Sequence, residues 1–327
     1  MSRAAAFVML TGLLGTSLPG AAAPFAYITN QGSHDVSVID LASRQVVATV
    51  AVGRSPAGVV AVSRAGKVFV SNPDSRNISV IAMRGHRLVG TLEAGDGSVG
   101  LDASPDGTQL FAADWYANRL LVFDTLDTLA HRNPVASIPV GHAPAGVAAH
   151  SDGNTVFVAE RDDDSVAVVG VREGRVLSRV KVGSHPFALL FDAPRQRLYA
   201  LNVQSDEVSV IDTSGDTRSL KLIATLKVGK APYGAALAHG GTLIYVTNQH
   251  DDSVSVIDAA SLKVVRTLAG FGYPEGVAAF GDQVYVVNWM DDNVSVLEAA
   301  SGRELERIAT GSNSRGFGAF IGEPRGH

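Results

Sequence analysis

Apolar segments alternate with short polar segments along the chain from about residue 25 onward, and the alternation repeats. Each of seven copies opens with an aromatic residue, and a second apolar segment starts ten residues later in every copy. The period between copies varies from 40 to 46 residues, whereas this offset is constant. A constant offset inside a variable period predicts two paired strands joined by a fixed loop, with insertions elsewhere. The opening aromatic residues are Tyr27, Phe69, Phe111, Phe157, Tyr199, Tyr245 and Tyr285, and the second segments start at Ser37, Ser79, Leu121, Ala167, Ser209, Ser255 and Ser295.

Residues 231–269 show how one copy is built. Turn signals such as Gly240-Gly241 separate segments rich in β-branched and aromatic residues. They predict four antiparallel strands, here called A to D, at Pro232 to Ala238, Leu243 to Asn248, Ser253 to Asp258 and Lys263 to Leu268. Short strands repeating at this period predict an all-β fold, a seven-bladed β-propeller with four-stranded antiparallel blades.

The two ends of the repeat predict how the ring closes. The first copy starts at its second strand, Phe25 to Asn30, and the chain ends with a spare first strand, Gly316 to Gly322. Pairing the C-terminal strand with the three N-terminal strands completes the seventh blade and removes two open edges. Residues 24–327 are therefore expected to form a single domain, and a monomer is expected.

Residues 1–23 do not follow the repeat and resemble a secretory signal peptide. Arg3 supplies a positive charge, Ala4 to Leu18 is apolar, and Ala21-Ala22-Ala23 offers small residues for cleavage. The alternative is an N-terminal membrane anchor. The signal peptide predicts a periplasmic or secreted protein that does not associate with a membrane after its removal. The chain contains no cysteine, which excludes a lipoprotein anchor, disulfides, a c-type haem site and a thiolate metal centre.

The repeat carries a family resemblance. Tyr245-Val246-Thr247-Asn248, with the variants at Tyr27 to Asn30 and Tyr285 to Asn288, precedes segments such as Ser255-Val256-Ile257-Asp258. These residues resemble the YVTN-repeat β-propeller family, and the layout is similar to its YncE-like periplasmic members. The resemblance implies the propeller fold over essentially the whole mature chain. It leaves the activity open, since members are linked variously to nucleic acids, cell surfaces or accessory roles near redox enzymes.

The loops from strand D to the next strand A are expected to surround a central funnel, where ring-shaped folds often bind ligands. One position in these loops varies around the ring and is occupied by Ala57, Val99, Ala145, Phe187, Tyr233, Glu275 and Phe317. Four consecutive copies are bulky or charged there, and nearby loop positions add His185, Tyr273 and Arg315, with Trp289 from a neighbouring B–C loop. We interpret these eight residues as a candidate ligand site: His185, Phe187, Tyr233, Tyr273, Glu275, Trp289, Arg315 and Phe317. The alternative is that they plug the funnel, with Glu275 and Arg315 as an ion pair.

Trp115 and Tyr116 lie in a B–C loop at the same end and are candidate partner-binding residues. Stacking of bases on these side chains and Trp289 is the nucleic-acid alternative. Acidic loops count against it, because Asp162-Asp163-Asp164, Asp251-Asp252 and Asp291-Asp292 face the same way. The net charge of −5 likewise gives no general attraction to phosphates. These acidic residues also have a structural interpretation as turn caps.

No set of residues predicts a catalytic or metal centre. His142 and His185 come from adjacent loops, but two histidines without a third ligand make a weak metal site. A lyase or hydrolase using Glu275 and His185 is the enzymatic alternative. We therefore predict a binding protein without chemistry of its own or a cofactor. Its partner is expected to be an exported protein or a small molecule, within a redox or metal-handling system by analogy with the family.

Overall fold

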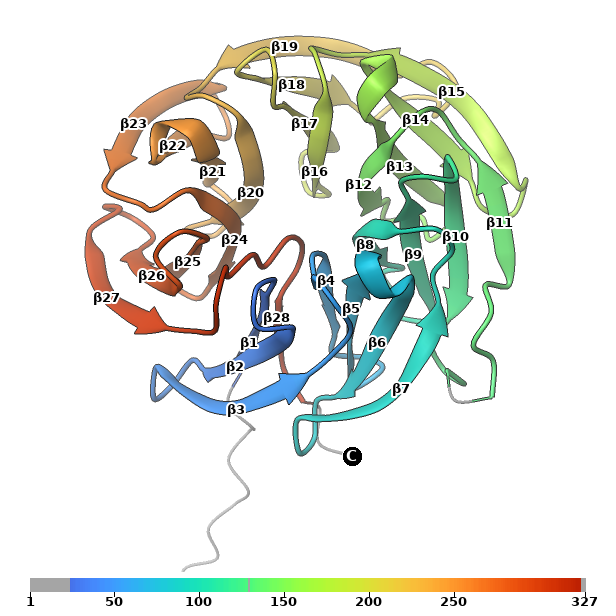
Figure 1. Cartoon of the computed structure of the whole chain (residues 1–327). Coiled ribbons are helices and arrows are strands. Elements are labelled where there is room, and N and C mark those ends of the chain that lie inside the picture. The colour runs from blue at the N-terminus through green and yellow to red at the C-terminus, as the bar shows by residue number, and fades with distance from the viewer. Residues whose placement is uncertain (1–23, 129, 325–327) are drawn as a thin grey trace, which may run out of the picture.

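The computed structural model describes residues 24–128 and 130–324, which form seven four-stranded antiparallel sheets arranged in a ring (Figure 1). This confirms the predicted fold class. Residues 1–23, the predicted signal peptide, lie outside the described residues. Within the described part of the chain, no helix has the length and apolar character needed to cross a membrane.

Six blades are built from consecutive strands, with the innermost strand first and the outermost last. Their bounds are β4 Val59–Val62, β5 Lys67–Asn72, β6 Asn77–Ala82 and β7 Arg87–Glu93; β8 Ser98–Ala103, β9 Gln109–Asp114, β10 Arg119–Asp124 and β11 Ala136–Pro139; β12 Pro144–Ala149, β13 Thr155–Glu160, β14 Ser165–Gly170 and β15 Arg175–Lys181; β16 Pro186–Asp192, β17 Arg197–Asn202, β18 Glu207–Asp212 and β19 Lys221–Lys227; β20 Pro232–Ala238, β21 Leu243–Asn248, β22 Ser253–Asp258 and β23 Lys263–Ala269; β24 Pro274–Phe280, β25 Gln283–Asn288, β26 Asn293–Glu298 and β27 Glu304–Ala309. Three 3-10 turns lie in B–C loops, η1 Pro73–Ser75, η2 Arg161–Asp163 and η3 Gln249–Asp251.

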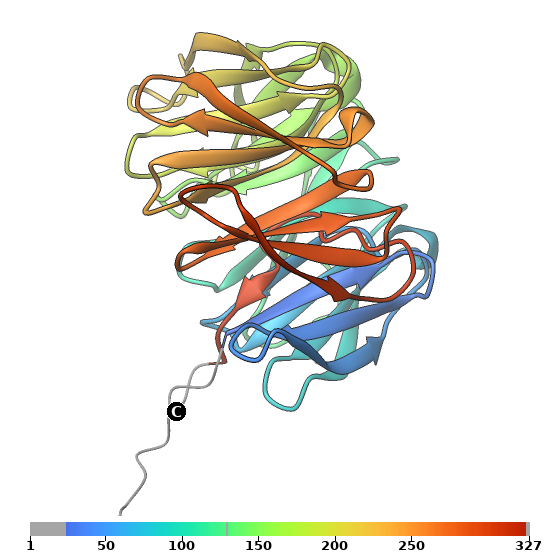
Figure 2. The same cartoon turned by 90° about the vertical axis from the view of Figure 1, so that its left-hand side faces the viewer.

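The remaining blade joins the two ends of the chain, in the order β28-β1-β2-β3. Its strands are β1 Phe25–Asn30, β2 Asp35–Asp40, β3 Gln45–Ala51 and β28 Ile321–Gly322. Closure through the C-terminal segment is therefore confirmed, and Figure 2 shows this segment beside the N-terminal blade.

The predicted strand from Gly316 to Gly322 is wrong in its extent, because only Ile321–Gly322 is regular strand. Gly316 and Gly318 adopt positive φ angles of 60° and 121°, which interrupt the extended backbone. The interrupted segment instead bonds on two sides. Tyr27 of β1 donates its N–H to the Phe320 carbonyl, and Val59 of β4 donates to the Phe317 carbonyl. The C-terminal segment thus lies between β1 of its own blade and β4 of the next blade, and it bonds to both.

The Asn and Ser positions of the repeat form a buried hydrogen bond within five of the seven blades. Asn248, at the end of β21, donates from Nδ2 to the Ser255 hydroxyl of β22 over 2.9 Å. The equivalent pairs in four other blades are Asn30–Ser37, Asn72–Ser79, Asn202–Ser209 and Asn288–Ser295. In the two remaining blades an acid replaces the asparagine and pairs with an arginine, Asp114 with Arg119 and Glu160 with Arg179. The repeated motif therefore pairs the buried amide N–H of asparagine at the funnel end of the second strand in five blades, while the Oδ1 atom of each of these asparagines has no hydrogen-bond partner among the described residues.

Glycine at the start of five inner strands, β4, β8, β12, β20 and β24, lets neighbouring blades approach closely, whereas β16 has Ala188 at the equivalent position. A Cβ added to Gly100 of β8 would lie 2.1 Å from the Ala145 carbonyl oxygen of the next blade. Gly58 and Gly276 meet the following blade in the same way, at 2.1 and 2.0 Å. The inner strands can converge on the axis because these positions carry no side chain.

We expect Gly100→Ala to lower the free energy of unfolding by about 1–3 kcal/mol, because the new methyl group overlaps a backbone carbonyl of the next blade. Urea denaturation monitored by circular dichroism measures this change. Gly215→Ala is the matched control, since Gly215 has open space around its Cβ position. Equal stability of the two variants would show that the blades can separate at no cost.

Candidate functional site

Polar side chains of the B–C loops hold the neighbouring D–A loops in place. The backbone N–H of His185, in the loop before β16, donates to the Asp164 carboxylate over 2.9 Å. The same bond recurs from Ala231 to Asp206, from Tyr273 to Asp252 and from Asn313 to Asp292. The donor and acceptor residues all have positive φ angles. The turn-capping interpretation of these acidic residues therefore agrees with the structure, and the caps fix the loops that surround the funnel.

Three predicted aromatic residues meet at the ring axis. Phe187 of β16, Tyr233 of β20 and Phe317 of the C-terminal segment pack with ring centroids 4.6–5.6 Å apart. All three are buried. Contact spacings in this range are favourable for aromatic pairs. The three rings, together with Glu275 and Arg315, form what we call the floor cluster.

Glu275 of β24 and Arg315 form a buried ion pair within the floor cluster. Arg315 Nε lies 2.9 Å from Glu275 Oε2, and the Glu275 side chain is only 4% exposed. Arg315 also donates to the Tyr233 hydroxyl, while Gln249 Nε2 donates to Glu275 Oε1 over 2.7 Å. Burial raises the pKa of Glu275 to about 7, and the Arg315 charge limits this rise. Burial likewise raises the pKa of Tyr233, so its hydroxyl stays protonated.

Above the floor cluster lies a depression of about 700 Å³, which we call the outer funnel pocket. Its walls contain the aromatic rings of Trp115, Phe187 and Tyr233, and the Trp115 and Phe187 centroids lie 6.2 Å apart. Arg161 stands over the Trp115 ring at 5.7 Å, and its guanidinium also bonds Asp162. The remaining lining residues are Val203, Gln204, Asp206, Lys230, Ala231, Gln249 and His250. The pocket therefore combines flat apolar walls with two cationic side chains.

Several residues that line the outer funnel pocket were not predicted from the sequence, although they occupy one repeated position. The residue directly after each second strand reaches the funnel end, and Arg161, Val203 and Gln249 line the outer funnel pocket from this position. The full set of equivalents is Gln31, Pro73, Trp115, Arg161, Val203, Gln249 and Trp289. A comparison of this position among the seven copies, like the comparison of the D–A loops, identifies Arg161, Val203 and Gln249 as candidates.

The other predicted residues lie around the floor cluster. Tyr273 stacks between His250 and Trp289, with ring centroids 5.6 and 5.5 Å away. Trp289 also donates from its indole N–H to Gln31 over 3.2 Å. His185 faces Asp162, at 3.8 Å.

Tyr116 is separated from its neighbour Trp115. It is 71% exposed and lines a different depression together with His34, Arg54 and Arg76. The two adjacent aromatic residues therefore serve different parts of the funnel-end surface.

The enzymatic alternative requires Glu275 and His185 to act together. Glu275 contacts Arg315 and Gln249, whereas His185 lies beside Asp162, and no hydrogen bond or ion pair among the described residues joins the two. His142 and His185 likewise contact different aspartates, Asp163 and Asp162. Across residues 24–128 and 130–324, no three His, Cys, Asp or Glu side chains are grouped closely enough to hold a metal ion.

Comparisons with known proteins agree on the architecture. No protein-family model matches the sequence, and a search of curated proteins finds no relative. Among solved structures, a functionally unknown protein from Desulfotomaculum acetoxidans aligns with a TM-score of 0.78 at 15% identity, over 92% of this chain and 99% of that chain. Kuenenia stuttgartiensis hydrazine synthase aligns with a TM-score of 0.74 at 19% identity, over 90% and 99% of the respective chains. Dihydro-heme d1 dehydrogenase NirN in complex with DHE aligns at 0.67 and 14% identity, over 89% and 74%. At these identities the likeness defines a shared seven-bladed β-propeller fold.

Proposed function

We propose that this protein is an exported, non-catalytic binding protein that holds a small ligand in the outer funnel pocket. The observation that carries the proposal is the open pocket itself, with the half-buried ring of Trp115 as a wall and the buried rings of Phe187 and Tyr233 at its base. Its volume of about 700 Å³ lies within the range of known small-molecule sites. The repeat motifs and the leader at residues 1–23 support membership of the YVTN-repeat family and a periplasmic or secreted location.

The lining favours a flat, apolar ligand that carries a negative group. The half-buried Trp115 ring offers a surface for stacking, and the edges of the buried Phe187 and Tyr233 rings extend the apolar lining. Lys230 is available to pair with an anion, and Arg161, which already bonds Asp162, adds a second positive charge to the lining beside the carboxylate of Asp206. One of the similar structures is a dehydrogenase by name, and this name refers to a heme, a flat macrocycle. This supports the predicted association with a redox system.

Protoporphyrin IX, a flat macrocycle with two carboxylates, is a suitable probe for this pocket. We expect it to quench the fluorescence of Trp115 on binding, and we expect Trp115→Ala to weaken binding, measured by calorimetric titration, by about tenfold or more. Tyr116→Ala is the matched control, because Tyr116 lines a separate depression. A flat cationic dye of similar area tests the charge preference, and equal binding of both probes would overturn the anionic part of the proposal. Failure of every flat probe to bind, or a loss in Tyr116→Ala instead, would overturn the pocket assignment.

A second candidate is an exported protein partner on the same face. Tyr116 and Met290 lie in funnel-end loops and are 71% and 63% exposed, and such side chains often anchor protein interfaces. The same two variants separate the candidates. Loss of a captured exported protein with Tyr116→Ala, but not with Trp115→Ala, would favour the protein partner.

A further inference from the structure

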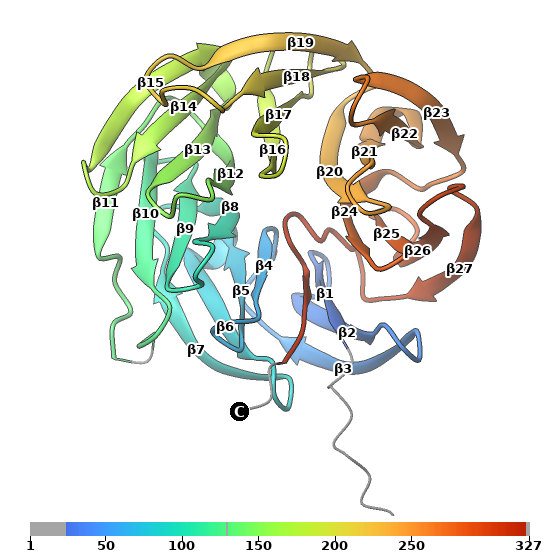
Figure 3. The ribbon, with the colours of Figure 1, turned by 180° about the vertical axis from the view of Figure 1, so that it is seen from behind.

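Below the floor cluster, the ring encloses a second hollow that the outer funnel pocket does not include. This inner channel has a volume of about 370 Å³ and is lined by the inner strands β8, β12, β16, β20 and β24 and by the C-terminal segment. Phe317 belongs to its lining and also to the floor cluster, so the floor cluster separates the channel from the funnel. Figure 3 shows the ring from behind, with the inner strands arranged around its axis.

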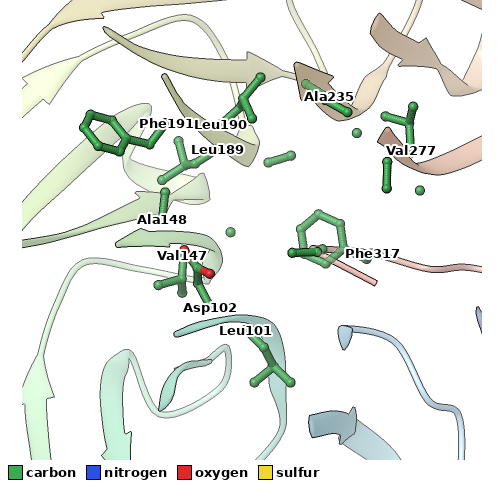
Figure 4. Close-up of a pocket in the computed structure, with 18 of the residues that line it drawn as sticks. Leu101, Asp102, Val147, Ala148, Leu189, Leu190, Phe191, Ala235, Val277 and Phe317 are labelled. Carbon is green, nitrogen blue, oxygen red and sulfur yellow. The ribbon is translucent and has the colours of Figure 1, made fainter. Parts of the chain in front are cut away.

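The side chains that line the inner channel are apolar apart from Asp102, whereas backbone groups of the inner strands add polar surface. Val147, Leu189, Ala235 and Val277 project into it from four different blades (Figure 4). Among the lining residues, all of which lie in the described part of the chain, Asp102 of β8 is the single ionisable one. Figure 4 shows Asp102 among the side chains around the hollow. The channel therefore holds one acidic group and no lysine, arginine or histidine to balance it.

The repeat does not account for an acidic residue at position 102. The equivalent positions in the other six blades are apolar, namely Val60, Ala148, Leu190, Ala236, Ala278 and Phe320. The carboxylate accepts backbone N–H bonds from Ala149 of the next blade and from Ala103, both at 2.8 Å. These bonds satisfy one lone pair on each oxygen and supply no positive charge. Burial raises the pKa of Asp102 to about 6, which shows that its charge is poorly compensated.

We propose that the inner channel is a binding site for a small organic cation, an ammonium group on an apolar body, with Asp102 as its counter-ion. The ammonium group supplies the charge that the protein does not provide, and the free lone pairs of the carboxylate accept its N–H bonds. The apolar body contacts the small aliphatic side chains that surround the hollow, and the Phe317 ring at one end adds an aromatic surface for a cation. This site is independent of the outer funnel pocket.

Cyclohexylammonium and cyclohexanol test the proposal, because they share a shape and differ in charge. In phosphate buffer near neutral pH, calorimetric titration is expected to show binding of cyclohexylammonium at least about tenfold tighter than cyclohexanol. Asp102→Asn is expected to remove this preference. Glu306→Gln is the matched control, since it removes one carboxylate from the exposed outer strand β27 and is expected to leave binding unchanged.

A second variant tests the same site in case Asp102→Asn does not fold. Ala235→Phe fills the channel from β20 without altering the carboxylate, and it is expected to abolish binding of cyclohexylammonium while protoporphyrin binding in the outer funnel pocket persists. Binding of cyclohexylammonium that survives in both Asp102→Asn and Ala235→Phe would overturn the proposal. Equal binding of the alcohol and the ammonium ion by the wild type would overturn the role of Asp102.

Discussion

A chain truncated after residue 313 is expected to lose the closed ring and to aggregate instead of unfolding reversibly. Residues 314–322 bond to strands of three blades at once, β1, β4 and β24. Arg315 donates its N–H to the Thr29 carbonyl of β1 and accepts from Gly276 of β24, while Ala61 of β4 donates to the Ala319 carbonyl. The truncation also removes Phe317 and Phe320, which are 6% and 0% exposed. Loss of one buried phenylalanine side chain lowers the free energy of unfolding by about 3–5 kcal/mol, so the loss of both approaches the whole stability of a typical domain.

Size-exclusion chromatography and calorimetry measure this effect directly. The truncated chain is expected to elute as large aggregates and to show no cooperative thermal transition, because β1 and β4 then present open strand edges. Removal of residues 324–327 alone is the control, since it spares every contact named above. Phe320→Ala gives an intermediate case, with a loss of about 3–5 kcal/mol in an otherwise closed ring. An unchanged melting temperature after the longer truncation would contradict closure by the tail.

The fold could be predicted from the sequence because the repeat fixes both the register and the number of blades. The constant offset of ten residues corresponds to hairpins of one register, as in the pairing of Val246 with Ser255 and of Ile28 with Ser37. The predicted strands of residues 231–269 match β20 to β23, with β23 one residue longer. The backbone path of the C-terminal segment could not be predicted, because Gly316 and Gly318 are compatible with an ordinary strand. In the structure their positive φ angles turn the chain toward β4.

The candidate site could be predicted only in part. Phe187, Tyr233 and Phe317 stood out because equivalent positions elsewhere carry small side chains, and the structure brings them together. Asp102 was not identified, because the side chains that face the axis are known only once the strands are placed. The available signal was a single acidic residue at a position that is apolar in the other six copies. Volume and shape of the two hollows depend on side-chain packing, which no repeat pattern encodes.

The stability of the wild type relative to Glu275→Gln is expected to fall by about 3 kcal/mol as the pH rises from about 4.5 to about 7. Glu275 ionises near pH 4.5 in an unfolded chain, whereas burial in the floor cluster raises its pKa to about 7. The folded state therefore holds a proton that the unfolded state releases in this range, and rising pH favours unfolding. The contribution is fully present below pH 4.5 and is lost as the pH passes the folded pKa. Glutamine imitates the protonated form and does not titrate, so the difference between the two proteins isolates this group.

Urea denaturation at several pH values, from 4.5 to 8, measures the difference. Glu306→Gln, on the exposed strand β27, corrects for the general effect of removing one carboxylate. Arg315→Met gives an independent check, because loss of the guanidinium removes the charge that favours ionised Glu275. Stability in that variant is expected to keep falling to a higher pH than in the wild type, because the folded pKa of Glu275 rises further. If the wild type instead gained stability over Glu275→Gln with rising pH, the attraction between Glu275 and Arg315 would exceed the cost of burying the carboxylate, and the floor of the funnel would be held by a fully ionised pair.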